Sequence, residues 1–152
     1  MQRSVSSPAS ISGDLSVPGD KSISHRSLIL NAMATGDALV TGLSSGEDVM
    51  STMACLRALG VEIETGDQPG TVVVHGAGGG LQEPDGILDA GNSGTSMRLL
   101  SGLLAGQPFT SILTGDASLR GRPMGRIVQP LKQMGAQIMA RKDSTLAPLT
   151  IH

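Results

Sequence analysis

The chain has 152 residues, enough for one ordinary domain with a sizeable core. Its 39% hydrophobic and 16% charged residues exclude a disordered chain and are typical of a soluble globular protein. The formal charge of −2 argues against nucleic acid or an anionic membrane as the main partner, and the single aromatic residue, Phe109, leaves no platform for stacking bases.

The cysteine and histidine content excludes further kinds of site. The single cysteine, Cys55, rules out an internal disulfide and a thiolate zinc cluster, and its place in a predicted helix favours burial. The histidines, His25, His75 and His152, show no metal-ligand spacing. No apolar run approaches the roughly 20 residues of a membrane span, and residues 1–10 hold no signal-peptide core. We therefore expect a protein of the reducing cytoplasm that binds no metal.

Apolar periodicity and turn residues divide the chain into short elements. Gly36, Gly60 and Gly135 each follow a helical pattern as stop signals, and the turn sequence at 66–70 indicates a hairpin. In chain order the predicted elements are a strand over 13–17, a helix over 22–34, a strand over 38–43, a helix over 45–59, a hairpin of 61–65 with 71–75, a helix over 92–105, a strand over 109–114, a helix over 123–134, and a strand pair of 136–140 with 149–151.

For two of these helices the sequence also predicts an apolar face or a cap residue. The apolar face of the first helix is expected to contain Ile23, Leu30 and Met33. In the second helix, Ser45 fits the cap position, with Asp48 three residues later as a residue of the helix start.

One segment of the sequence recurs. LRALGVEI at 56–63 aligns without a gap with LKQMGAQI at 131–138, 75 positions later. We interpret the chain as a mixed α/β fold with two copies of one helix–strand–helix–strand–strand unit, whose strand order does not follow from the sequence. Because the chain stops at His152, where the last strand should still be running, we expect it to be part of a longer protein.

Three predicted helix starts combine glycine or small residues with basic side chains. They read PGDKSISHR (residues 18–26), GNSGTSMR (91–98) and LRGRPMGR (119–126). A helix N-terminus presents unpaired N–H groups and a partial positive charge, both of which favour an anion. Three such starts in a chain with no excess of basic residues indicate a pocket for small molecules that carry more than one phosphate or carboxylate.

Each helix start offers its own set of candidate groups. Ser22 and Arg26 lie four residues apart on one helix face, where together with Lys21 they can meet one phosphate. At the second start, Gly94 leaves no side chain between the backbone and a ligand, while Thr95 and Arg98 face the same way. The third start offers the guanidinium groups of Arg120 and Arg122, which suit carboxylate or phosphate, with Arg126 expected at the surface.

These starts also have purely structural interpretations. The first is then a capped helix with solvated charges, the second an N-cap by Asn92 or Ser93 with a tight helix contact at Gly94, and the third a solvated basic loop. The nearby carboxylates show no pair with spacing diagnostic of acid–base chemistry. The residues therefore indicate anion binding more clearly than they indicate a catalyst.

From about Ile11 to its last residue, the chain resembles the N-terminal part of the EPSP synthase (3-phosphoshikimate 1-carboxyvinyltransferase) family. The resemblance rests on the first two motifs and on GDASLRGRPMG (115–125), in the family's order and at family-like separations. It implies transfer of the enolpyruvyl group of phosphoenolpyruvate to the 5-hydroxyl of shikimate 3-phosphate, with release of phosphate, in aromatic amino-acid biosynthesis. It implies neither a metal nor an organic cofactor.

The resemblance also assigns roles to residues. Lys21, Ser22 and Arg26 would bind shikimate 3-phosphate, and Lys21, Gly94 and Arg122 would bind phosphoenolpyruvate. Three further residues of the second motif have less definite roles in the site: Asn92, Thr95 and Arg98. The family's proton-acceptor aspartate is expected beyond residue 152, so no catalytic residue is assigned in this chain.

Family members have two domains, each of three βαβαββ units, that close over the substrates. The resemblance places residues 1–17 as a strand segment in the opposite domain, residues 18–85 as a first unit and residues 86–152 as a second. The remainder of the enzyme is therefore expected as a partner, without which this part is inactive. Missing units are also expected to leave an apolar face uncovered.

Some positions indicate a branch of the family. Leu99 stands where many glyphosate-sensitive members have proline, and PGDK at 18–21 and DASL at 116–119 are similar to the glyphosate-tolerant branch. Gly94, in contrast, is retained where a tolerant member can carry a larger residue. We therefore expect the complete enzyme to show intermediate tolerance.

Three alternatives stay open at this point. The chain can be a non-catalytic anion-binding module, or a structural domain whose basic helix starts are only caps. It can also be a relative of UDP-N-acetylglucosamine enolpyruvyl transferase. Against that relative stand Ser22, where it has asparagine, and the absence of a cysteine around Leu119.

Overall fold

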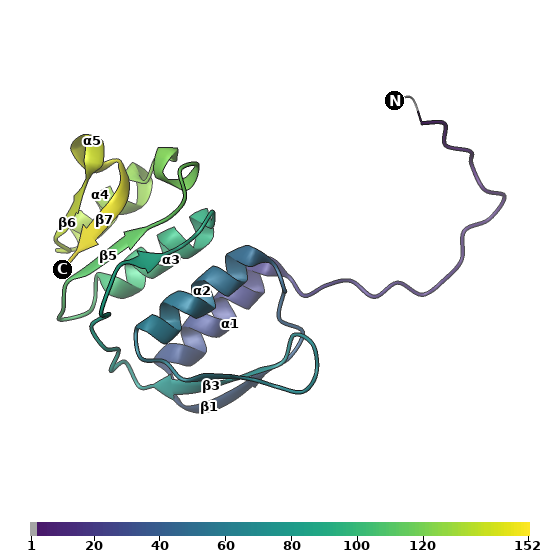
Figure 1. The fold of residues 1–152 in the computed structure, drawn as a ribbon, viewed down its shortest axis with the longest axis horizontal. Coiled ribbons are helices and arrows are strands. Elements are labelled where there is room, and N and C mark those ends of the chain that lie inside the picture. The colour runs from purple at the N-terminus through teal and green to yellow at the C-terminus, as the bar shows by residue number, and fades with distance from the viewer. Residues whose placement is uncertain (1–2) are drawn as a thin grey trace.

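The computed structural model describes residues 3–152, and its three longest helices lie between two sheets (Figure 1). The helices are α1 (Lys21–Met33), α2 (Glu47–Ala58), α3 (Gly94–Leu104), α4 (Gly125–Gln133) and α5 (Arg141–Ser144), with a 3₁₀ turn, η1, at Leu119–Gly121. The strands are β1 (Thr35–Val40), β2 (Ile63–Thr65), β3 (Val72–Ala77), β4 (Leu88–Asp89), β5 (Ser111–Thr114), β6 (Ile138–Ala140) and β7 (Leu146–Ile151).

The two sheets share one topology, which confirms the predicted repeat. The first sheet has the order β1-β3-β2 and the second the order β4-β5-β7-β6, so β5-β7-β6 repeats the first sheet. The shift of 75 positions carries Ile63–Thr65 onto Ile138–Ala140 residue by residue. The predicted hairpin of β2 with β3 is also confirmed, with Ile63 opposite Val74.

The first sheet has no counterpart of β4 within residues 3–152, and the predicted strand over 13–17 is wrong for this structure. Residues 3–20 are irregular and run away from the two sheets (Figure 1). Leu15 and Val17 are 87% and 74% exposed. A strand forms only where a neighbouring backbone accepts and donates its hydrogen bonds, and the described chain offers this segment none. Its assignment to an opposite domain stays a prediction.

Two local predictions are corrected between α1 and α2. β1 begins three residues before the predicted 38–43, because it pairs with β3 from Thr35 and Gly42 turns the chain with a φ of +68°. Ser45 does not cap α2. Gly46 occupies the cap position, and its N–H donates to Ser44 Oγ at 3.4 Å.

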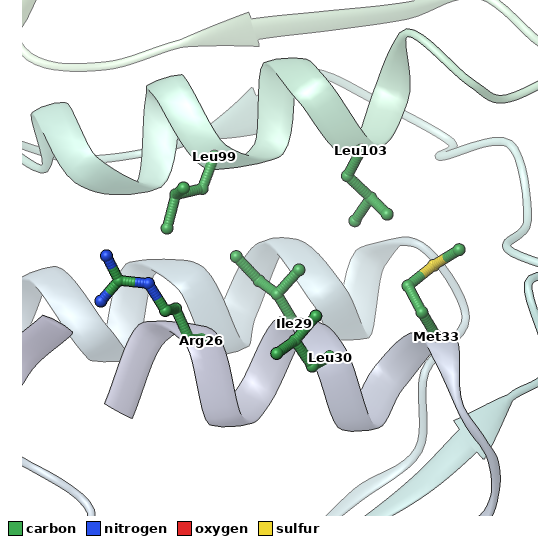
Figure 2. Close-up of a pocket in the computed structure, with 6 residues that line it drawn as sticks. All are labelled: Arg26, Ile29, Leu30, Met33, Leu99 and Leu103. Atoms are coloured by element: carbon green, nitrogen blue, oxygen red, sulfur yellow. The ribbon is translucent and has the colours of Figure 1, made fainter. Parts of the chain in front are cut away.

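The predicted apolar face of α1 is largely exposed in the structure. Ile23 and Leu30 are 65% and 66% exposed, whereas Ser24, His25, Leu28 and Ala32 are buried. Helical spacing alone does not show which face of a helix packs against the rest of the protein. On the buried face, Ser24 and His25 form hydrogen bonds with Asp20 and Thr52. Ile29, Leu30 and Met33 line an apolar groove of about 360 Å³ with Leu99 and Leu103 of α3 (Figure 2). This agrees with the expectation of an uncovered apolar face.

The core lies between the helices and the inner faces of both sheets. Leu56 and Leu59 at the end of α2, Val74 of β3, and Leu100 of α3 are fully buried members of one continuous cluster. Cys55 is 2% exposed, which confirms its predicted burial. Within the described residues, no helix has the length and apolar character needed to cross a bilayer.

Candidate anion-binding site

The start of α1 is built around Asp20. The Asp20 carboxylate accepts from the Ile23 N–H at 2.7 Å and caps the helix, and its carbonyl accepts from the Ser24 hydroxyl at 2.8 Å. Lys21 contacts the Asp48 carboxylate of α2. Because Lys21 remains 54% exposed, this ion pair is worth about 0–1 kcal/mol, and the ammonium group can turn to a bound anion at little cost.

At the start of α3, the side chains of Arg98 and Arg122 lie close to Gly94. Ser93 caps the helix by accepting from the Ser96 N–H at 3.0 Å, one of the two caps considered from the sequence. A Cβ placed on the buried Gly94 would lie 3.0 Å from Arg98 Nη1 and 3.5 Å from Arg122 Nη1. The two guanidinium groups and the helix N-terminus therefore provide positive charge around a backbone position that no side chain covers.

Arg122 is held in this place from the loop before α3. Its guanidinium donates to Asn92 Oδ1, and Asn92 Nδ2 donates to Asp116 Oδ2 at 2.6 Å. Asp116 Oδ1 also accepts from the N–H of Leu119, the first residue of η1, at 2.7 Å. The hydrogen bonds from Asn92 and Leu119 lower the pKa of Asp116, which keeps this carboxylate ionised as an acceptor.

Arg98 is the more enclosed of the two arginines. It donates to the Gly94 carbonyl at 3.3 Å, and its Nε is buried with no hydrogen-bond partner among the described residues. Burial, followed by repulsion from Arg126 and Arg122, lowers its pKa. Arg98 and Arg126 also line one pocket beside Gly125, while Arg126 is exposed as predicted. An unpaired donor and three neighbouring cations make this a region that favours an anion.

A buried chain of hydroxyl groups joins the three helices just below their starts. His25 Nδ1 lies 2.8 Å from Thr52 Oγ1, which lies 2.7 Å from Ser96 Oγ. The Ser96 hydroxyl in turn lies 3.0 Å from the Asp48 carbonyl. The network connects α1, α2 and α3, so it fixes the Lys21 end of α1 relative to the Gly94 end of α3.

Removing the central hydroxyl should loosen this arrangement. We expect Thr52→Val to lower the free energy of unfolding by about 1–3 kcal/mol, because it leaves the buried Nδ1 of His25 without a partner and removes one of the partners of the Ser96 hydroxyl. Urea unfolding followed by circular dichroism measures the change. Thr65→Val on the exposed side of β2 is the matched control, and an equal loss in the two variants would contradict the role of the network.

His25 should make stability depend on pH. Burial lowers its pKa below the usual histidine value of about 6.5, with Lys21 adding to the effect. In mildly acid solution the unfolded chain therefore binds a proton that folded His25 does not, so the stability contributed by neutral His25 is present above about pH 6.5 and is lost as the pH falls below it. His75 has the opposite shift.

A residue-specific measurement separates the two histidines. Imidazole resonances followed between pH 5 and 8 should give His25 a lower midpoint than His75, because burial lowers the pKa of His25 and the hydrogen bond to Asp37 raises the pKa of His75. A His25 midpoint at or above that of His75 would contradict the burial argument.

The structure brings together most of the residues singled out from the sequence. Gly94, Arg98, Arg122 and Asn92 meet at the start of α3, and Lys21 is linked to that region through Asp48. Ser22 and Arg26 lie on the exposed side of α1, where Arg26 donates to the Ser22 carbonyl at 3.1 Å. Thr95 is half-buried on the first turn of α3.

Other predicted residues lie apart from this region or serve a different role. Arg120 does not join the group around Gly94 and instead lines a separate pocket with Arg141. The helix expected to begin at Pro123 begins at Gly125, after η1. The sequence reasoning missed Asp20 as a cap and Asp48 as the partner of Lys21. The Asp20 cap could have been found from its place immediately before the helix, whereas the ion pair spans 27 positions.

The donors around Gly94 suit an anion rather than a metal ion, because they are N–H groups and guanidinium groups without lone pairs to offer. Cys55 is no nucleophile, since burial raises the pKa of its thiol to about 12.

Comparisons with known proteins place this arrangement in a family. The family model for EPSP synthase (3-phosphoshikimate 1-carboxyvinyltransferase) matches residues 5–152. A 3-phosphoshikimate 1-carboxyvinyltransferase of Herpetosiphon aurantiacus is 57% identical over 152 residues, which cover 99% of this chain and 35% of that protein. One from Chloroflexus aurantiacus is 58% identical over 150 residues, which cover 97% of this chain and 34% of that protein.

A solved structure supports the same assignment. An EPSP synthase from Acinetobacter baumannii matches with a TM-score of 0.87 and 51% identity, over 91% of this chain and 31% of that one. The chain thus spans about a third of the length of the curated relatives that it matches. Sequence, motifs and fold agree, and the chain belongs to the EPSP synthase family.

Proposed function

We propose that this chain forms part of the substrate site of an enzyme that transfers the enolpyruvyl group from phosphoenolpyruvate to the 5-hydroxyl of shikimate 3-phosphate. The products are 5-enolpyruvylshikimate 3-phosphate and phosphate, on the route to aromatic amino acids. The observation that carries the proposal is the convergence of Arg98 and Arg122 on Gly94 at the N-terminus of α3. Family membership supports the choice of substrates.

The chain's own residues serve to bind and orient the two anions. Lys21, Ser22 and Arg26 hold shikimate 3-phosphate at the start of α1. Lys21, Gly94 and Arg122 hold phosphoenolpyruvate, whose negative groups meet the α3 N-terminus and the Arg122 guanidinium. Arg98, Asn92 and Thr95 complete the surroundings, with Asn92 holding Arg122 in position.

Binding in this way brings the reacting atoms together. The 5-hydroxyl oxygen loses its proton and forms a bond to the enol carbon of phosphoenolpyruvate, while the neighbouring methylene carbon gains a proton. The tetrahedral intermediate then loses phosphate from the former enol carbon and a proton from the neighbouring methyl carbon, which restores the double bond. Fixed cations around Gly94 stabilise the anions without reorganising during the reaction. We assign the proton transfers to groups outside these residues, in the remaining part of the enzyme, which acts in the cytoplasm.

A chimeric enzyme tests the proposal. The segment of the Herpetosiphon aurantiacus relative that matches this chain is replaced by this chain, which is 57% identical to it. We expect the chimera to release phosphate only when both phosphoenolpyruvate and shikimate 3-phosphate are present. A folded chimera that binds shikimate 3-phosphate and releases no phosphate would favour an anion-binding module instead.

Gly94→Ala in this chimera should weaken phosphoenolpyruvate binding selectively. The added methyl group meets the ends of two flexible arginine side chains, which can shift, so we expect stability to change by less than about 1 kcal/mol. The methyl group occupies ligand space, so we expect KM for phosphoenolpyruvate to rise about tenfold, with a smaller change in KM for shikimate 3-phosphate. Steady-state kinetics with each substrate varied in turn measures both. A selective rise in KM for shikimate 3-phosphate would contradict the assignment of Gly94.

We further propose intermediate glyphosate tolerance. Leu99 follows Arg98 on α3 and is partly buried in the groove with Leu103, while Gly94 keeps the ligand space open. Complete inhibition of the chimera by low glyphosate at saturating substrate would argue against this.

A further inference from the structure

The outer face of the first sheet carries a row of ionisable side chains across all three strands. Asp37 of β1 is the register partner of His75 of β3, and the His75 N–H donates to the Glu62 carbonyl at 3.0 Å on the other side. Because side chains alternate along a strand, Glu64 of β2 points to the same face as Glu62. The intervening Ile63 and Val74 are buried on the inner face.

His75 is oriented within this row by one carboxylate. Its Nδ1 lies 2.8 Å from Asp37 Oδ1, so Nδ1 carries the proton that is donated to Asp37. Its Nε2 lies 3.7 Å from Glu64 Oε1, which is too long for a hydrogen bond. This Nε2 atom is buried and has no hydrogen-bond partner among residues 3–152.

The unpartnered nitrogen faces two carboxylates on the neighbouring strand. The ligand atoms of Glu62, Glu64 and His75 all lie within 4.8 Å of one another. A four-coordinate zinc ion with bonds of about 2.0–2.2 Å brings its ligand atoms to within about 3.5 Å of each other. Both glutamates are exposed, so rotations of their side chains suffice to close this difference.

We propose that His75 Nε2, Glu62 and Glu64 form a binding site for a divalent cation of the zinc class, with Asp37 as the positioning residue. An imidazole ligated through one nitrogen while the other donates to a carboxylate is the arrangement that orients histidine in metal sites. The mixed set of one nitrogen and two carboxylates suits Zn²⁺, whereas Mg²⁺ and Ca²⁺ prefer oxygen ligands alone.

This proposed site is separate from the anion-binding region and differs from the expectation drawn from the spacing of the histidines. Spacing along the sequence does not reveal it, because the three residues meet only through the pairing of β2 with β3. A bound cation would relieve repulsion between Glu62 and Glu64 and would tie these strands together. It should therefore raise the melting temperature as its concentration rises.

The test is a titration of the chain with ZnCl₂, observed through the imidazole resonances of His75. The hydrogen bond to Asp37 raises the pKa of His75, so the titration is run at about pH 8, above the usual histidine range, to favour the neutral imidazole that binds a metal. We expect one equivalent of Zn²⁺ to shift the His75 signals while those of buried His25 stay in place. MgCl₂ should leave them unchanged.

Variants separate ligation from non-specific binding. The double change Glu62→Gln with Glu64→Gln should weaken binding at least tenfold, and Asp37→Asn about tenfold through loss of orientation. Glu83→Gln, an exposed carboxylate in the loop after β3, is the matched control and should bind as the parent does. Unshifted His75 signals at saturating Zn²⁺, or unchanged affinity in the double variant while its spectrum remains dispersed, would overturn the proposal.

Discussion

Arg122→Ala in the chimeric enzyme is expected to abolish most of its turnover. Arg122 contributes one of the two guanidinium groups over Gly94, and its loss removes one of the charged groups that hold the phosphoenolpyruvate anion. Truncating one member of a hydrogen-bonded charge contact costs about 2–5 kcal/mol, which corresponds to about 30-fold to several-thousand-fold in kcat/KM for phosphoenolpyruvate. Steady-state phosphate release measures the loss.

Arg120→Ala supplies the control for this change. Arg120 lies two positions earlier and is exposed, and its backbone carbonyl, which the substitution retains, accepts from Arg141 Nη2 at 3.0 Å. Its replacement removes the same charge from the same loop without touching Gly94. Equal losses in the two variants would show that net charge matters instead of the position of Arg122, and would contradict the site.

Gly19→Ala is expected to damage both folding and activity. A Cβ at Gly19 would lie 1.7 Å from the Gly42 carbonyl oxygen and 3.2 Å from the Ser44 N–H nitrogen, so backbone must move. The Ser44 N–H donates to Ser24 Oγ at 2.9 Å, which ties this loop to α1. We expect about 1–3 kcal/mol of lost stability from the overlap. Because Lys21 lies two residues further on, activity should fall by at least tenfold.

Gly86→Ala is the matched glycine variant, because a Cβ there meets nothing within 4 Å. Denaturant unfolding and phosphate release on both variants test the argument. A Gly19→Ala protein with the stability and activity of Gly86→Ala would show that the contact with Gly42 is not needed.

Local signals predicted much of the fold. Gly60 and Gly135 follow α2 and α4 as helix stops, and the turn at 66–70 correctly joined β2 to β3. The match of 56–63 with 131–138 predicted two units, and the shared strand order confirms this. These features depend on residues close together in the chain, or on direct comparison of two segments.

Features set by distant contacts could not be predicted in the same way. Apolar spacing put Ile23 and Leu30 on one face of α1, but only the packing of α1 decides which face is covered, and here it buries Ser24 and His25. The strand over 13–17 failed because pairing needs a partner. The convergence of Arg98 with Arg122 likewise depends on a contact between distant residues, the hydrogen bond from Arg122 to Asn92, although the motifs had already identified both arginines.

The central claim is that the starts of α1 and α3 bind the two anionic substrates together. Its most direct test is a ¹⁵N–¹H spectrum of the ¹⁵N-labelled chain, titrated with shikimate 3-phosphate in the presence of the unlabelled remainder of the Herpetosiphon aurantiacus enzyme. We predict saturable shifts at Lys21, Ser22 and Arg26, followed by shifts at Gly94 and Arg122 when phosphoenolpyruvate is added. A dispersed spectrum in the assembled complex that responds to neither substrate would contradict the claim.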